Sequence, residues 1–265
     1  MKSLRFFCAV AVCLLSCTCA NSQAAPASSQ AQPPAPSSAA RATRPEPPPP
    51  DLATLQKKLM DFPQLATYHD RNAQLAPPAA GEKRVVFFGD SITEGWARSW
   101  NQFFAGKPYI DRGISAQTTE QMVLRFHQDV VDLKPAVVIV LAGTNDVAEN
   151  TGPMTPEMTL DNFRAMLEMA RANKIKLVVC SILPADDFWW HRGLQPAHKI
   201  QALNQQLKAW ADGEHLVWVD YYTSMADANG AMKASLSPDG VHPNTSGYAI
   251  MAPLAEAGIA KAIEK

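Results

Sequence analysis

Four short segments of this sequence carry side chains that can do chemistry together. GDSIT supplies the hydroxyl of Ser91, and DGVHP supplies the carboxylate of Asp239 and, three residues later, the imidazole of His242. GTND supplies the carboxamide of Asn145, and Gly113, which has no side chain, supplies a backbone N–H group. A hydroxyl, an imidazole that removes its proton and a carboxylate that orients the imidazole form the set used in nucleophilic catalysis by serine.

Each segment also has a purely structural interpretation. A serine after a strand often caps a helix, and a glycine at a strand end often only permits a turn. Asn145 could bond its own backbone in a turn, and His242 could be a solvated imidazole in a tight loop. The catalytic interpretation is favoured because all four segments occur in one chain, at places that a parallel sheet would bring together.

The elements that must position these segments are visible as short β-rich runs separated by amphipathic stretches. The runs cover residues 84–88, 136–141, 176–182 and 216–219, with a weaker run at 109–112. The run at 136–141 is apolar on both faces, as expected of a buried parallel strand. Capping signals mark helices between the runs, at Thr118 with Gln121 and at Thr155 before Pro156. The alternation predicts one α/β domain with a central, mostly parallel, five-stranded sheet.

In an open α/β sheet, ligands bind beyond the carboxyl ends of the strands. Ser91 follows the run at 84–88, Gly113 follows the weaker run, and Asn145 follows the run at 136–141. The segment with His242 precedes a final helix. The sheet would therefore gather the four segments at one edge.

Together the four segments resemble the blocks of the SGNH, or GDSL, hydrolase family. The blocks are named for Ser, Gly, Asn and His, which are matched here by Ser91, Gly113, Asn145 and His242. The resemblance extends over roughly residues 84–264. It implies a flavodoxin-like three-layer sandwich and a carboxylic ester hydrolase that uses no metal and no cofactor.

The second block departs from the family pattern at two positions. Asp111 stands where we expect Asn, and Ala116 stands where we expect Gly. Because Gly113 itself is retained, we expect the departures to affect the shape of this loop more than the activity.

Ester hydrolysis gives each residue a role. Ser91 would be the nucleophile, His242 the general base and then the general acid, and Asp239 the group that orients His242. The backbone N–H groups of Ser91 and Gly113 and the side-chain amide of Asn145 would form the oxyanion hole. The α/β-hydrolase fold is disfavoured, because Ser91 lies in Gly-x-Ser-x-Thr and not in a Gly-x-Ser-x-Gly elbow.

Several other residues could be taken for functional groups. Asp90 and Asp146 are more simply acceptors for loop N–H groups, and Cys180 is interpreted as inert core. Trp189 and Trp190 could line the acyl or alcohol site, or they could cover the end of the sheet. The histidines show no metal spacing, and no zinc-peptidase, P-loop or dinucleotide motif is present.

The first 50 residues predict export. A basic start precedes ten apolar residues, Phe6 to Leu15, which are too few to span a bilayer, so residues 1–20 are interpreted as a signal peptide. Cleavage could occur before Asn21, or Leu-Leu-Ser-Cys could act as a lipobox and make Cys17 a lipidated membrane tether. Residues 21–50, with nine prolines, predict a disordered Pro/Ala/Ser-rich linker before a hydrolase domain at 51–265.

Composition narrows the classes of function. The formal net charge is −1, which does not suggest a nucleic-acid partner, and four of five cysteines precede residue 20, which excludes a disulfide scaffold. The leading hypothesis is an exported serine esterase, periplasmic, secreted or membrane-anchored, that acts on short-chain acyl esters, including O-acetyl groups of carbohydrates. One alternative is a lysophospholipase or thioesterase with the same machinery. Another is a non-catalytic surface protein that binds a glycan or lipid. The oligomeric state is left open.

Overall fold

The computed structural model describes residues 45–265, so the expected signal peptide and most of the expected linker lie outside the described residues. Five strands form one sheet in the order β2-β1-β3-β4-β5, and every neighbouring pair is parallel. They are β1 (Val85–Gly89), β2 (Tyr109–Gly113), β3 (Val137–Leu141), β4 (Lys176–Cys180) and β5 (Val217–Val219). This order is that of a flavodoxin-like sheet and confirms the expected fold class.

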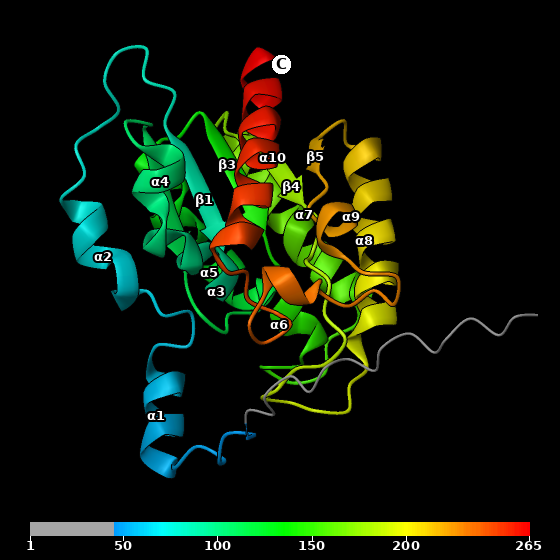
Figure 1. Ribbon diagram of the computed structural model, residues 1–265. Coiled ribbons are helices and arrows are strands. Elements are labelled where there is room, and N and C mark those ends of the chain that lie inside the picture. Colours follow the sequence, from blue (N-terminus) through cyan, green and yellow to red (C-terminus); the bar gives the residue numbers. More distant parts are fainter. Residues whose placement is uncertain (1–44) are drawn as a thin grey trace, which may run out of the picture. The chain divides into compact units, whose positions relative to one another are not determined.

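Helices cover both faces of the sheet (Figure 1). The helices of the described residues are α1 (Leu52–Met60), α2 (Ala66–Ala73), α3 (Ser91–Glu94), α4 (Trp100–Phe104), α5 (Thr119–Asp129), α6 (Thr144–Val147), α7 (Pro156–Ala172), α8 (Pro196–Gly213), α9 (Tyr222–Met225) and α10 (Thr245–Glu264), with short 3-10 helices η1 (Gly95–Arg98), η2 (Val131–Leu133) and η3 (Ala234–Leu236). Helices α5, α7 and α8 pack on one face and α10 on the other, which completes the three layers.

The alternation of side chains along each strand feeds two apolar cores. Val86 and Phe88 of β1 point into the core shared with α5, α7 and α8, whereas Val85 and Phe87 point into the core shared with α10. Both faces of the sheet are therefore shielded from water, which explains why β1, β3 and most of β4 are continuous apolar runs in the sequence. The edge strand β2 is half-exposed at its start, which explains its weaker pattern.

One predicted strand was too long. The run at 176–182 predicts an extended chain throughout, but β4 ends at Cys180. Beyond it, the N–H and C=O groups of Ile182 pair with the side chain of Asn204 on α8. A buried carboxamide thus takes the place of a neighbouring strand, and the chain is free to leave the sheet.

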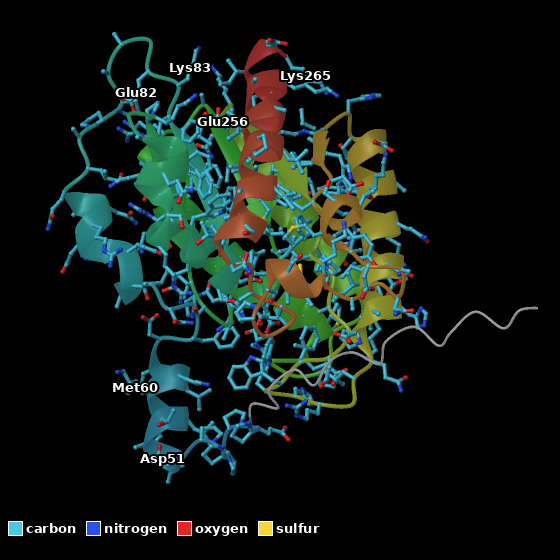
Figure 2. The ribbon with its side chains drawn as sticks, in the orientation of Figure 1. Asp51, Met60, Glu82, Lys83, Glu256 and Lys265 are labelled. Carbon is cyan, nitrogen blue, oxygen red and sulfur yellow. The ribbon has the colours of Figure 1, made fainter. Side chains whose placement is uncertain are left out.

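The predicted caps are present. The side chain of Gln121 accepts a hydrogen bond from the Thr118 N–H group (3.1 Å) at the start of α5, and Thr155 accepts from the Met158 N–H group (3.3 Å) in α7. Asp51 caps α1, which buries none of its side chains (Figure 2). No helix in residues 45–265 combines the length and the apolar character needed to cross a membrane.

Candidate active site

The structure brings Ser91, His242 and Asp239 into one hydrogen-bonded line. Ser91 Oγ lies 2.9 Å from His242 Nε2, and His242 Nδ1 lies 2.7 Å from Asp239 Oδ2. Ser91 opens α3 directly after β1, while the other two residues share the loop before α10. The sheet thus closes a gap of 151 positions in the sequence.

Asp239 is held as an anion. Burial by itself would raise its pKa, but hydrogen bonds from the His242 side chain and from the backbone N–H groups of His242 and Val241 hold the pKa well below its usual range. An ionised carboxylate only accepts hydrogen bonds, so Nδ1 of His242 carries a proton. In the neutral ring, Nε2 then presents its lone pair to the hydroxyl of Ser91, which is the orientation of a general base.

The three candidate oxyanion donors come from neighbouring strand ends. Gly89 pairs with Gly113 of β2 and with Leu141 of β3, so the chain leaves all three strands at one level. A Cβ atom on Gly113 would lie 2.0 Å from the backbone nitrogen of Glu94, so only glycine fits beside α3. This close approach of Gly113 to the backbone of α3 explains why the second block has a glycine at position 113.

Two of these donors already have partners. The Gly113 N–H group donates to Asp111 Oδ1 (2.8 Å). Asn145, which is 3% exposed, donates from Nδ2 to the backbone oxygen of Gln117 (3.0 Å) and to Asp90 Oδ2 (3.3 Å). An oxyanion would therefore have to share or replace these contacts.

The two departures in the second block have visible consequences. Ala116 adopts φ +65°, a left-handed conformation that glycine takes without strain, and its C=O group accepts a hydrogen bond from Asn150 Nδ2 (3.1 Å). Burial raises the pKa of the Asp111 carboxyl group to about 7. An asparagine at this position would carry no charge. The Asp111 side chain still accepts the Gly113 N–H group, as an asparagine oxygen could.

The extra carboxylates serve the loops, as expected. Asp90 accepts from the Ile92 N–H group (2.9 Å), and burial raises its pKa to about 6. Asp146 accepts from the N–H group of Thr119 (3.0 Å), and burial raises its pKa as well. Cys180 is a fully buried free thiol, in agreement with its interpretation as core.

The aromatic loop after β4 lies beside the imidazole. The ring of Trp190 is 6.2 Å from that of His242 between centroids, and its Nε1 donates to Asn150 Oδ1 (2.8 Å). Trp189 packs edge-to-face on Trp190 at 5.5 Å, and the fully buried Phe188 contacts Trp190 at 5.0 Å. Trp190 therefore adjoins the triad, and Trp189 lies one ring further out.

Sequence reasoning missed two residues that shape the site, Asn150 and Arg125. Arg125 is fully buried, donates to the backbone oxygens of Gly89 and Arg112 (2.9 Å each) and pairs with Asp129 at 3.0 Å. It thereby joins the ends of β1 and β2, and burial lowers its pKa to about 10. The i,i+4 spacing of Arg125 and Asp129 was the available signal, but such pairs usually lie on exposed helix faces.

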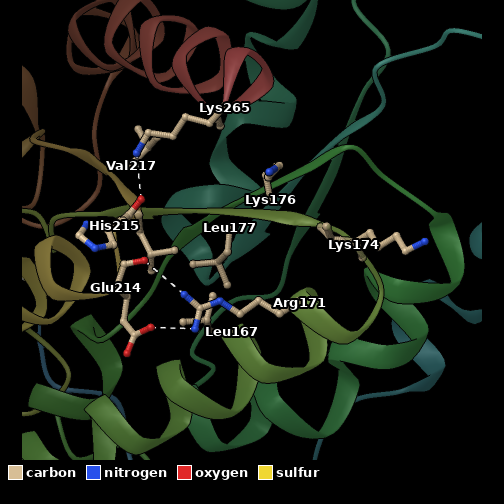
Figure 3. Close-up of a pocket in the computed structure, with 12 residues that line it drawn as sticks. Leu167, Arg171, Lys174, Lys176, Leu177, Glu214, His215, Val217 and Lys265 are labelled. Carbon is tan, nitrogen blue, oxygen red and sulfur yellow. Dashed lines mark hydrogen bonds and ion pairs between the residues drawn. The ribbon is translucent and has the colours of Figure 1, made fainter.

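A cavity of about 430 Å³ lies at the opposite end of the sheet, where β4 and β5 begin (Figure 3). Arg171 pairs there with Glu214 (2.7 Å), and Lys265 donates to the backbone oxygen of His215 (2.9 Å). Helices α7, α8 and α10 all end nearby, so the cations around this cavity offset the partial negative charge of helix C-termini. Within residues 45–265, no three His, Cys, Asp or Glu side chains gather as a metal site requires.

Comparison with known proteins agrees with this fold. Residues 87–250 match the GDSL-like Lipase/Acylhydrolase family. A crystal structure of a GDSL-like lipase from Bacteroides thetaiotaomicron is 47% identical with a TM-score of 0.74, over 76% of this chain and 99% of that chain. An acetylxylan esterase from Geobacillus stearothermophilus is 28% identical over 204 residues, which cover 65% of this chain and 91% of the esterase.

A lipoprotein of Bacillus subtilis, YqeF, is 31% identical over 121 residues, or 39% of this chain, and the match spans half of that relative's length. The family match itself covers most of the chain, from β1 into α10. The protein therefore belongs to the GDSL-like lipase/acylhydrolase family of ester hydrolases.

Proposed function

We propose that this protein is an exported serine esterase that hydrolyses short-chain acyl esters, including O-acetyl groups of carbohydrates. The observation that carries the proposal is the unbroken hydrogen-bond line from Ser91 Oγ through His242 to the ionised Asp239. No metal or cofactor takes part in this mechanism.

In the acylation half-reaction, Ser91 Oγ attacks the ester carbonyl carbon while its proton passes to His242 Nε2. The carbonyl π electrons move onto the oxygen, which becomes the oxyanion of a tetrahedral intermediate. When the C–O bond to the alcohol breaks, His242 Nε2 returns the proton to the departing oxygen, and an acyl group remains on Ser91. Asp239 stabilises the imidazolium that exists between these two transfers.

In the deacylation half-reaction, water takes the place of the alcohol. His242 Nε2 removes a proton from the water as its oxygen attacks the acyl carbon, and the proton then goes to Ser91 Oγ as the acyl–enzyme bond breaks. The products are the carboxylic acid and the regenerated hydroxyl of Ser91. Both steps require the neutral imidazole, because a protonated Nε2 has no lone pair to accept a proton.

The N–H groups of Ser91 and Gly113 and the amide of Asn145 are proposed to bind the oxyanion. Ser91 N–H is at the first turn of α3, where helix geometry leaves such groups without an intrahelical partner. The longer contact of Asn145 Nδ2, 3.3 Å to Asp90 Oδ2, is the one that an oxyanion would replace. The tighter contact to the backbone of Gln117 would keep the amide in place.

The substrate proposal rests on the aromatic loop and on one relative. Trp190 provides a half-buried ring next to His242, and the half-buried ring of Trp189 packs on Trp190, as expected for the wall of a small-molecule site. The acetylxylan esterase relative supports an acetylated carbohydrate as substrate. The export proposal rests on the predicted signal at residues 1–20, and the lipoprotein relative supports a tether through Cys17.

Two measurements test the proposal. A fluorophosphonate should label Ser91, and Ser91→Ala should abolish labelling and turnover while the protein stays folded by circular dichroism. Chromogenic esters of increasing acyl length should show the highest kcat/KM for acetyl. A preference for long chains would indicate a lysophospholipase or thioesterase, no turnover would indicate a binding protein, and an active, folded Ser91→Ala would refute the triad.

A further inference from the structure

Asn150 and Trp190 form a hydrogen-bonded chain that ends at Asn145. The indole Nε1 of Trp190 donates to Asn150 Oδ1 over 2.8 Å, and Asn150 Nδ2 donates to Asn145 Oδ1 over 2.8 Å. Asn150 Nδ2 also donates to the backbone oxygen of Ala116 over 3.1 Å. The chain thus connects the aromatic loop after β4 with the carboxamide after β3.

The direction of each bond in this chain is fixed by chemistry. An indole N–H can only donate, and a backbone C=O can only accept. Trp190 therefore requires the oxygen of the Asn150 carboxamide, and Ala116 requires its NH₂ group. Since that NH₂ group also meets the oxygen of Asn145, the NH₂ group of Asn145 must point the other way, toward Asp90 next to the nucleophile.

The same tryptophan contacts the proposed general base. Its ring lies 6.2 Å from that of His242, so one side chain borders the imidazole and also, through Asn150, orients the carboxamide of Asn145. Asn150 and Trp190 are both half-buried, and each would lose water if a substrate occupied the adjoining site. Hydrogen bonds between polar groups gain strength when water is excluded.

We infer that Asn150 is a positioning residue for the oxyanion donor Asn145, and that the N–H group of Trp190 fixes the orientation of Asn150. The inference rests on the proposed function, because it takes Asn145 Nδ2 as an oxyanion donor. A carboxamide turned by half a rotation would present its oxygen to the developing negative charge and repel it. The chain from Trp190, together with the bond from Asn145 Nδ2 to the backbone oxygen of Gln117, opposes this rotation.

The Asn150→Asp variant tests the inference with little change of shape. It keeps an acceptor for Trp190, removes the donor to Asn145 Oδ1 and to the Ala116 oxygen, and places a carboxylate oxygen against these two acceptors. We expect kcat for a chromogenic acetyl ester to fall roughly 10- to 100-fold, since a misplacement of about 1 Å can cost that much. KM should stay within a few-fold. Asn229→Asp, in an exposed turn, is the matched control and should keep the wild-type kcat.

The Trp190→Phe variant tests the other end of the chain. It keeps one aromatic ring but removes the N–H group together with the rest of the indole, so kcat should fall at least about 3- to 10-fold, the worth of one neutral hydrogen bond. Trp210→Phe is the matched control. Trp210 packs on Phe163, and its Nε1 has no hydrogen-bond partner among residues 45–265. The Trp210→Phe substitution should therefore leave kcat unchanged.

A double-mutant cycle with Asn145→Ala shows whether Asn150 acts through Asn145. If it does, Asn150→Asp should change kcat less than about twofold in the Asn145→Ala background, because the group to be positioned is gone. A full additional loss in that background, or a wild-type kcat in folded Asn150→Asp, overturns the inference. If Asn150→Asp does not fold by circular dichroism, Trp190→Phe in the same cycle decides by the same criteria.

Failure of the proposed function gives a different result. An active Ser91→Ala removes the triad, and a wild-type kcat in Asn145→Ala removes the oxyanion role and the inference with it. An impaired Asn145→Ala beside a fully active Asn150→Asp removes only the positioning role.

Discussion

Replacing Asn145 by alanine separates a structural role from a catalytic one. The side chain is 3% exposed and takes part in three hydrogen bonds, with Asp90, with the backbone of Gln117 and with Asn150. In this variant, Asn150 keeps its hydrogen bond to the backbone oxygen of Ala116. Asp90 Oδ2 and the backbone oxygen of Gln117 each lose a donor. A buried polar group left unpaired costs about 1–3 kcal/mol, so we expect the free energy of unfolding to fall by that amount with the fold retained.

The effect on turnover is predicted independently. If Asn145 Nδ2 binds the oxyanion, its bond strengthens as charge develops, so the loss should appear in kcat and leave KM within a few-fold. Removal of one such donor from a different serine hydrolase costs about 10²–10³-fold in kcat, or roughly 3–4 kcal/mol. The backbone donors of Ser91 and Gly113 remain, so Asn145→Ala should still be faster than Ser91→Ala.

The assay is steady-state hydrolysis of a chromogenic acetyl ester, with thermal unfolding measured on the same samples. Asn204→Ala is the control for buried carboxamides, since the two side-chain hydrogen bonds of Asn204 go to the backbone of Ile182. It should lower the Tm and leave kcat near the wild-type value. A folded Asn145→Ala with a wild-type kcat would refute the oxyanion assignment and leave Asn145 with a structural role only.

Further predictions concern the carboxylates and the N-terminus. Asp239→Asn should lower kcat by as much as about 10⁴-fold at pH 8, because a carboxamide does not enforce the required tautomer of His242; an unchanged kcat would contradict this. Burial raises the pKa of Asp111 to about 7, above its unfolded value, so this residue opposes folding increasingly as the pH rises from about 4 to about 7. Asp111→Asn should therefore raise the Tm more at pH 8 than at pH 5, and equal shifts would refute the reasoning. If Cys17 is lipidated, Cys17→Ser should move the protein from the membrane fraction to the soluble one. A wild-type N-terminus at Asn21, found by intact mass, would indicate ordinary signal cleavage instead.

The sheet was predictable because burial on both faces leaves a direct record in the sequence. Strands β1 and β3 must be apolar at every position, and the caps of α5 and α7 depend on residues three positions apart. The end of β4 was not predictable in the same way. It depends on Asn204, which lies 22 positions from Ile182 and can pair with it only after α8 has packed on the sheet.

The residue types of the site could also be recognised from the sequence. Ser91, Asp239 and His242 stand in short motifs whose chemistry is local, and Asp239 reaches His242 across three positions. The orientation of Asn145 could not be read in this way. A carboxamide has a donor end and an acceptor end of nearly equal size, so its direction depends on its partners, and these partners are Gln117 and Asn150.

The sequence by itself therefore determined the parallel α/β sheet, the family and the residues that could carry the chemistry. Only the tertiary structure decided that Trp190 lies against His242, that Asn150 connects Trp190 to Asn145, and that Arg125 is buried between strand ends. The physical reason is the range of the interactions. Periodicity and capping act within a few residues, whereas the hydrogen bond of Trp190 to Asn150 spans 40 positions and forms only where β3 and β4 end side by side.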